Sequence, residues 1–286
     1  MRHYLLATAL IIFACFTLQA YAQSTTDESI TAIAFDDFIF SDGLTQYNLH
    51  YAFAGDIEKS GILFIHGTPG SWSAFELYLN DPSLQNDYFM VSVDRIGWGG
   101  SSFKDPDVID PHSRKPNSFS LQAESISAVM QRYPNKKWLL LGHSLGASIA
   151  PKVALINKKV NSLLLLAGSL EPKLGKPRWF NRFGNTQFIH WLLPKPLKYS
   201  NDEIMVLKHE LKLLETELAS QKLDVDVVVM QGMKDKLVSP KNSEYIMQTW
   251  PTSFNTVRKI ELTDANHFLP WRQTELVIKT IREFDF

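Results

Sequence analysis

The chain has 286 residues, of which 45% are apolar, 12% aromatic and 21% charged, and its formal net charge is -1. This composition excludes a disordered, collagen-like or low-complexity chain. The charge balance argues against a nucleic-acid-binding surface, which needs a basic excess. The single cysteine, Cys15, excludes an intrachain disulfide and a cysteine-based metal cluster. The length fits one large domain, because α/β folds often exceed roughly 200 residues as one unit.

Residues 1–22 are organised like a secretory signal peptide. Basic Arg2 precedes an uncharged stretch from Tyr4 to Leu18, and Ala20-Tyr21-Ala22 has the small residues of a cleavage site. We therefore predict export to the periplasm or secretion through a cleaved signal, with residues 23–286 forming the folded domain. The alternative is a membrane anchor that is not cleaved. A lipoprotein site is the weakest alternative, because the apolar run continues past Cys15.

Eight segments have the composition of β-strands. The first two alternate apolar and polar residues, as half-exposed antiparallel strands do, and five later ones are apolar runs typical of buried parallel strands. In chain order the eight are Thr31–Phe40, Gln46–Phe53, Gly61–Ile65, Tyr88–Val93, Lys137–Leu141, Ser162–Leu166, Val225–Met230 and Thr256–Leu262. Helical spacing occurs in Ser118–Tyr133, Leu145–Asn157, Pro240–Trp250 and Trp271–Phe284. This order predicts an α/β fold: a mostly parallel eight-stranded sheet with helices on both faces.

Residues from about 171 to 222 interrupt this alternation, because they contain prolines, aromatic residues and a helical pattern but no strand. Ser200-Asn201-Asp202-Glu203 predicts a helix start with a capping box, in which the Ser and Glu side chains satisfy free N–H groups. An apolar stripe at helical spacing follows, formed by Ile204, Leu207, Leu211, Leu214 and Leu218. We therefore predict a helical lid inserted over the edge of the sheet.

The most specific motif is Gly142-His143-Ser144-Leu145-Gly146, a G-x-S-x-G sequence between a predicted strand and a predicted helix. A nucleophile elbow requires this context, because the glycines leave room for a tight turn from which the serine projects. The helix start that follows offers backbone N–H groups to a developing oxyanion. The pattern therefore predicts Ser144 as a nucleophile. The alternative, a chance pentapeptide on a loop, does not explain the flanking elements.

A serine hydroxyl is a weak nucleophile and needs a general base, which a third group must orient. His267 fits as the base, because it follows the last predicted strand and precedes the last predicted helix. Asp235 fits as the acid, because it lies just past the strand Val225–Met230, and Glu171 is its rival after the preceding strand. The chain order Ser, Asp, His is that of the α/β-hydrolases.

A second oxyanion donor is expected in the turn His66-Gly67-Thr68-Pro69-Gly70, which follows the strand Gly61–Ile65. There the backbone N–H of Thr68 would join that of Leu145. Removal of one such donor typically lowers the rate about 100- to 1000-fold, so both should matter. We expect His66 to be structural, and the chemistry needs no metal or organic cofactor.

Together these motifs resemble the α/β-hydrolase superfamily, in its lid-bearing serine hydrolase branch. Three further segments extend the resemblance over nearly all of the chain after the signal: Asp94–Ser101, Gly232–Val238 and Asn266–Trp271. The resemblance implies a nucleophile, an acid, a base and two oxyanion amides at Ser144, Asp235, His267, Thr68 and Leu145. One departure is Asn266, because a glycine usually precedes the base.

The nucleophile narrows the reaction that the resemblance implies. Similar dehalogenases and epoxide hydrolases use Asp at the elbow, so Ser144 favours acyl transfer by an esterase, lipase or thioesterase acting on a small-molecule acyl substrate. Amidase, lactonase, carbon–carbon hydrolase and lyase chemistry remain alternatives, because a fold does not select a substrate. The rival from another class is a non-catalytic binding protein of the same fold.

The predicted lid also has an unusual local composition, because every charged residue from 173 to 198 is basic and five aromatic residues are interleaved with them. The basic residues are Lys173, Lys176, Arg178, Arg182, Lys195 and Lys198, and the aromatic residues are Trp179, Phe180, Phe183, Phe188 and Trp191. Such a segment suits weak contact with an anionic membrane surface or attraction of an acidic substrate. We favour the alternative in which the aromatic residues face the substrate. The pocket would then include His143, Phe188, Trp191 and Phe268.

Overall fold

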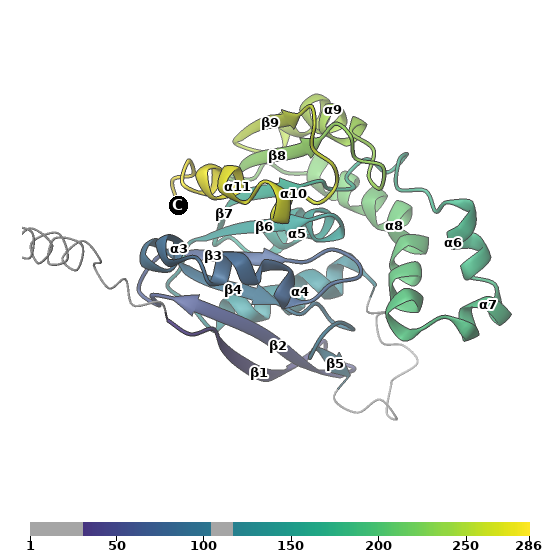
Figure 1. The fold of residues 1–286 in the computed structure, drawn as a ribbon, viewed down its shortest axis with the longest axis horizontal. Coiled ribbons are helices and arrows are strands. Elements are labelled where there is room, and N and C mark those ends of the chain that lie inside the picture. The colour runs from purple at the N-terminus through teal and green to yellow at the C-terminus, as the bar shows by residue number, and fades with distance from the viewer. Residues whose placement is uncertain (1–30, 104–116) are drawn as a thin grey trace, which may run out of the picture.

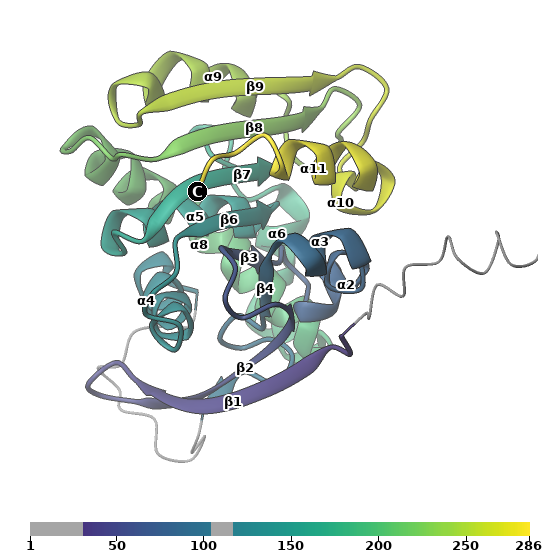
Figure 2. The same ribbon diagram turned by 90° about the vertical axis from the view of Figure 1, so that its left-hand side faces the viewer.

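The computed structural model describes residues 31–103 and 117–286, so the predicted signal peptide lies outside the described residues. The strands are β1 Ala34–Ser41, β2 Gln46–Gly55, β3 Gly61–Ile65, β4 Phe89–Val93, β5 Ser102–Phe103, β6 Trp138–His143, β7 Val160–Leu166, β8 Asp226–Gly232 and β9 Thr256–Leu262. Eight of them form one open sheet in the order β1-β2-β4-β3-β6-β7-β8-β9 (Figure 2), and short β5 pairs with β2. From β4 to β9 along this order all pairs are parallel, whereas β2 is antiparallel to both of its neighbours. This confirms the predicted eight-stranded, mostly parallel sheet.

The helices divide into a set on each face of the sheet and a set between β7 and β8. Their bounds are η1 Trp72–Phe75, α2 Glu76–Leu79, α3 Pro82–Asp87, α4 Phe119–Gln131, α5 Leu145–Ile156, α6 Trp179–Gly184, α7 Gln187–Leu192, α8 Lys195–Ala219, α9 Lys241–Thr249, η2 Trp250–Thr252, α10 Leu269–Arg272 and α11 Thr274–Ile281. Residues of α4, α5, α8 and α9 share one apolar core with the sheet, and residues of η1, α2, α3, α10 and α11 share the other. Because both faces are covered, β3, β4 and β6 are buried along their whole length.

The observed helices differ from the predicted ones in two places. The expected helix Trp271–Phe284 is instead two helices, α10 and α11, which meet at Gln273, where the backbone is not helical (φ -131°). Three short helices between β3 and β4 were not predicted. Each has four to six residues, which is too short to show a helical period.

The predicted start of the long insertion helix was wrong. Helix α8 begins at Lys195, after Pro194, so Ser200 lies inside the helix and caps nothing. Prolines suit a helix start because the first turn has N–H groups without intrahelical partners, and Pro196 occupies that turn. The leucine stripe is confirmed, since Leu207, Leu211, Leu214 and Leu218 are all buried.

Helices α6, α7 and α8 together form the insertion between β7 and β8, and α6 and α7 lie at its far end from the sheet (Figure 1). Helix α8 returns toward the sheet and packs against α5. Within residues 31–103 and 117–286, we find no helix long and apolar enough to cross a membrane.

Candidate active site

The turn between β6 and α5 holds Ser144 in a backbone conformation that few residues adopt, with φ 55° and ψ -116°. Its flanking glycines are required by close approaches. A Cβ on Gly146 would stand 2.0 Å from the carbonyl oxygen of Ile65, and one on Gly142 would stand 2.6 Å from the backbone of Ala147. The strand, the crowded turn and the helix therefore form the elbow that the G-x-S-x-G motif predicts.

The structure pairs the predicted base with the predicted acid. His267 lies in the loop between β9 and α10, and its Nδ1 is 2.7 Å from Oδ2 of Asp235. Both side chains are buried, at 8% and 0% exposure. Because a carboxylate only accepts hydrogen bonds, Nδ1 of His267 carries the hydrogen, and Nε2 is left to accept a proton. Glu171, the rival acid, has no part in this pair.

Asp235 is held as an anion by the loop after β8. Burial raises the pKa of its carboxyl, but hydrogen bonds from His267 and from the backbone N–H groups of Val238 and Leu237 outweigh burial, so the pKa lies below its ordinary value. Gln231, which the sequence analysis missed, places its side-chain nitrogen 3.4 Å from Oδ2 of Asp235. The available signal was a glutamine that follows the apolar run Val227–Met230 of strand β8.

Two cavities that share Thr68, Ser144, Leu237 and His267 form the candidate active site. The larger, of about 410 Å³, lies over the turn at Gly67–Ser71. The smaller, of about 280 Å³, extends toward the insertion and is also lined by Leu145. The structure thus brings the predicted nucleophile, base and oxyanion residues to one place.

A third cavity, of about 440 Å³, lies between the turn that holds Trp98 and helix α8. None of the described residues that line it is a serine, cysteine or histidine, so it has no nucleophile or base of the expected kind. In the part of the chain that the structure describes, no three His, Cys, Asp or Glu side chains are grouped to hold a metal ion.

The predicted pocket residues divide into two pairs. His143 and Phe268 line the larger cavity. Phe188 and Trp191 line neither cavity and are 69% and 73% exposed, because α7 lies beyond α6 at the outer end of the insertion (Figure 1). The insertion contributes Phe180 to the smaller cavity instead, an aromatic residue of the basic and aromatic segment that was not among the predicted pocket residues.

His143 supports the loop that holds His267, the predicted base. Its Nε2 donates to the backbone carbonyl of His267 at 3.0 Å, and its ring packs edge-on against Trp271. Burial, and after it the nearby charge on His267, lowers the pKa of His143 to about 3. His143 therefore stays neutral near pH 7 and positions the loop that carries the base.

His66 is fully buried and structural, as expected. Its Nδ1 donates to the carbonyl of Gly67 at 2.8 Å, and its Nε2 accepts from the backbone N–H of Arg95 at 3.1 Å. Burial and the charge of Arg95 hold the pKa of His66 well below its ordinary value. The neutral ring thus links the turn after β3, which carries Thr68, to the turn after β4.

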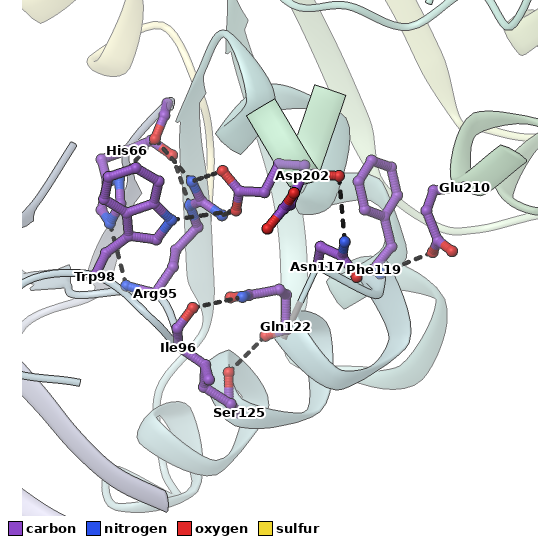
Figure 3. Close-up of polar contacts among 12 residues, drawn as sticks. His66, Arg95, Ile96, Trp98, Asn117, Phe119, Gln122, Ser125, Asp202 and Glu210 are labelled. Atoms are coloured by element: carbon purple, nitrogen blue, oxygen red, sulfur yellow. Dashed lines mark hydrogen bonds and ion pairs between the residues drawn. The ribbon is translucent and has the colours of Figure 1, made fainter. Parts of the chain in front are cut away.

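Arg95 extends this link to the insertion. Its guanidinium donates to the carbonyls of His66 and Gly67, at 3.0 and 2.8 Å, and its Nη1 lies 2.5 Å from Oε1 of Glu203 on α8 (Figure 3). Trp98 donates its indole N–H to the same carboxylate oxygen at 3.2 Å. Glu203, predicted as a helix cap, is instead a buried anchor that ties α8, through Arg95, to the turn after β3. The sequence analysis missed Arg95 because its partner lies far along the chain.

Several known proteins are similar to this chain in sequence or in fold. Residues 62–196 match the family model described as the alpha/beta hydrolase fold. An epoxide hydrolase from Vigna radiata has a similar structure, with a TM-score of 0.65, 14% identity and coverage of 91% of this chain and 98% of that one. A putative aryl esterase from Burkholderia cenocepacia has a TM-score of 0.64, 19% identity and coverage of 87% and 97%.

One sequence relative is a 1-acylglycerol-3-phosphate O-acyltransferase from Arabidopsis thaliana. It is 27% identical over 128 residues, which are 44% of this chain and 29% of the plant protein. The match therefore spans less than a third of that relative's length. The solved structures share the fold at low identity, and their names cover more than one reaction.

Proposed function

This chain belongs to the α/β-hydrolase superfamily, and we propose that within it the protein is a serine hydrolase that cleaves a carboxylic ester or a related acyl bond. The observation that carries the proposal is the buried hydrogen bond of 2.7 Å between His267 and Asp235, in a site whose cavities also hold Ser144. A buried, ionised carboxylate on Nδ1 orients the imidazole and stabilises its protonated form.

The reaction proceeds in two steps through an acyl-enzyme. Nε2 of His267 takes the proton of Ser144 as its Oγ attacks the substrate carbonyl, and the oxyanion is held by the N–H groups of Thr68 and Leu145. His267 then protonates the leaving group. A water molecule, deprotonated by His267, attacks the acyl-enzyme, and His267 returns that proton to Oγ of Ser144 as the acid is released. Asp235 remains ionised throughout and holds the imidazole in place.

The nucleophile supports an acyl substrate. A serine forms an ester intermediate only with a group that has an electrophilic carbonyl or its equivalent, so the chemistry fits esters, thioesters, lactones and amides. The similarity to a plant acyltransferase supports a second, related reaction, in which an alcohol replaces water as the acceptor of the acyl group. The first step is the same in both.

The direct test is turnover of purified protein on a panel of p-nitrophenyl esters with increasing acyl length, together with a thioester, a lactone and an anilide. Ser144→Ala should lower kcat on the best substrate about 10⁵-fold or more. Ser220→Ala, at the exposed end of α8, is the matched control and should retain wild-type turnover. Equal turnover by wild type and Ser144→Ala would refute the proposed nucleophile. No turnover on the whole panel would favour a binding protein.

A further inference from the structure

Helices α6 and α7 present apolar side chains that the proposed reaction does not use. Five of them, together with Leu197 in the first turn of α8, are more than half exposed and are defined here as the outer face: Trp179, Phe183, Phe188, Trp191, Leu192 and Leu197. A monomeric protein rarely gathers so many large apolar side chains in the open, and such patches mark contact with a partner or a membrane.

The burial of these helices is the reverse of what a helix in a globular protein shows. Such a helix normally buries its apolar residues against the core. Helix α7 contains Phe188, Ile189, Trp191 and Leu192 and buries none of its side chains, and α6 buries only Gly184. The neighbouring α8, by contrast, buries its leucine stripe. The apolar side of α6 and α7 is thus left for something outside the described chain.

The charges around the outer face favour one kind of partner. Every charged residue from 173 to 198 is basic, and all but Lys198 are exposed. Asp202, the first acid after them, is already paired with His190, at 2.9 Å. A second copy of the chain would bring like charges together, whereas an anionic lipid surface supplies negative headgroups for the cations and an interface for tryptophans. We propose that the outer face docks onto an anionic lipid surface.

This docking would place the membrane beside the cavity that holds Ser144. Helix α6 carries Trp179 and Phe183 of the outer face and also contributes Phe180 and Asn181 to that cavity. Arg178, at the start of α6, donates to the carbonyls of Lys236 and Leu237, at 2.9 and 3.0 Å. Both follow Asp235. The substrate class is therefore an amphiphilic acyl lipid taken from the membrane, and this part of the inference rests on the proposed function.

The test is sedimentation of the full-length protein with phosphatidylcholine vesicles, with and without phosphatidylglycerol. Wild type should bind the anionic vesicles, and salt should weaken the binding. Phe188→Ser/Trp191→Ser should weaken it at least about tenfold, because apolar contact drives interfacial binding. Arg182→Glu/Lys195→Glu should do the same, because each basic residue near such a surface strengthens binding about fivefold. All variants share residues 1–30, so that segment contributes equally to each.

Two control variants remove exposed apolar or basic side chains elsewhere on the protein. Ile57→Ser/Leu77→Ser removes two other exposed apolar side chains, and Lys137→Glu/Lys158→Glu reverses two exposed lysines before β6 and β7. Both should bind vesicles like wild type. Circular dichroism and turnover of a water-soluble short ester, unchanged within about twofold, would show that the outer-face variants are folded.

The outcomes separate this inference from the proposed function. Ser144→Ala should bind vesicles like wild type, so vesicle binding survives even if the nucleophile is another residue. Equal binding by wild type and the outer-face variants would overturn the docking, as would binding without preference for phosphatidylglycerol. Absence of lipid binding, with a dimer in analytical ultracentrifugation that Phe188→Ser/Trp191→Ser makes monomeric, would assign the outer face to self-association instead.

Discussion

Substitutions should disturb the crowded elbow and its surroundings much more than the outer end of the insertion. At the elbow, a single Cβ on Gly146 would collide with the carbonyl of Ile65, and in the loop after β8 Asp235 has no exposed side-chain surface. In α6 and α7, large aromatic side chains are mostly exposed and contact little of the described protein. The comparison separates two roles. The crowded region holds the proposed reacting groups in place, and the open region is free to adapt to what it contacts.

The largest expected effect is on the acid in the crowded region. Asp235→Asn should lower kcat about 10⁴-fold with little loss of fold, because an amide facing Nδ1 favours the wrong tautomer of His267. Kinetics on the best ester substrate measure this. Glu171→Gln changes the rival acid in the same way and should have little effect. If Glu171→Gln abolished turnover and Asp235→Asn did not, the assignment of the acid would be wrong.

The next effect tests the link between the two regions. Glu203→Leu leaves Arg95, which is 1% exposed, without its carboxylate, and should lower the free energy of unfolding by about 3–5 kcal/mol. Urea denaturation measures the loss. Arg95→Met/Glu203→Leu, which removes both charges, should recover much of it. Glu217 on the same helix forms a partly exposed ion pair with Lys152. Glu217→Leu should therefore lower the free energy of unfolding by only about 1 kcal/mol or less. Equal losses in the two single variants would contradict a buried anchor at Glu203.

A smaller effect comes from the neutral histidine behind the base. The pKa of His143 is lowered to about 3 by burial, so the unfolded chain binds a proton that the folded protein does not, and stability falls with pH below about 6.5. His66, whose pKa is also lowered, acts in the same direction. The pKa of Asp235 is lowered too, but its contribution is lost only below its ordinary range, at more acidic pH.

His143→Gln isolates that contribution, because glutamine can donate to the carbonyl of His267 but does not titrate. Between about pH 7 and about pH 5, the free energy of unfolding measured in urea should fall by about 2 kcal/mol less in the variant than in wild type. An identical pH dependence in the two proteins would mean that His143 is not held neutral by the fold.

The smallest effect is expected in the open region. Trp191→Ser should change the free energy of unfolding by no more than about 0.5 kcal/mol, since the side chain is 73% exposed. Leu211→Ala, in the buried stripe of the same insertion, should cost about 2–5 kcal/mol. A large loss in Trp191→Ser would show that α7 packs more tightly than its exposure indicates.

The same contrast explains what could be predicted from the sequence. Ser144 and Asp235 follow the largely buried parallel strands β6 and β8, and His267 follows the edge strand β9, so a local pattern places all three at one edge of the sheet. Arg95 and Glu203 depend on a contact between distant parts of the chain, which no local pattern records. Glu203 was misassigned because a capping box and a helix interior can carry the same residues.

The insertion was predicted as helical but not in its orientation. Helical spacing identifies the leucine stripe of α8, and packing buries it as expected. An aromatic residue in a short helix carries no sign of which side it faces, so Phe188 and Trp191 were expected in the pocket that Phe180 lines instead. Gln231 was overlooked because a single polar residue near a strand end gives no indication of its partner.

The central claim is that Ser144 is an activated nucleophile, and labelling with a fluorophosphonate tests it most directly. The folded protein should form one covalent adduct, which peptide mass spectrometry should place on Ser144. His267→Ala should label far more slowly, and denatured protein should not label. An adduct on another residue, or no adduct on the folded protein, would contradict the account.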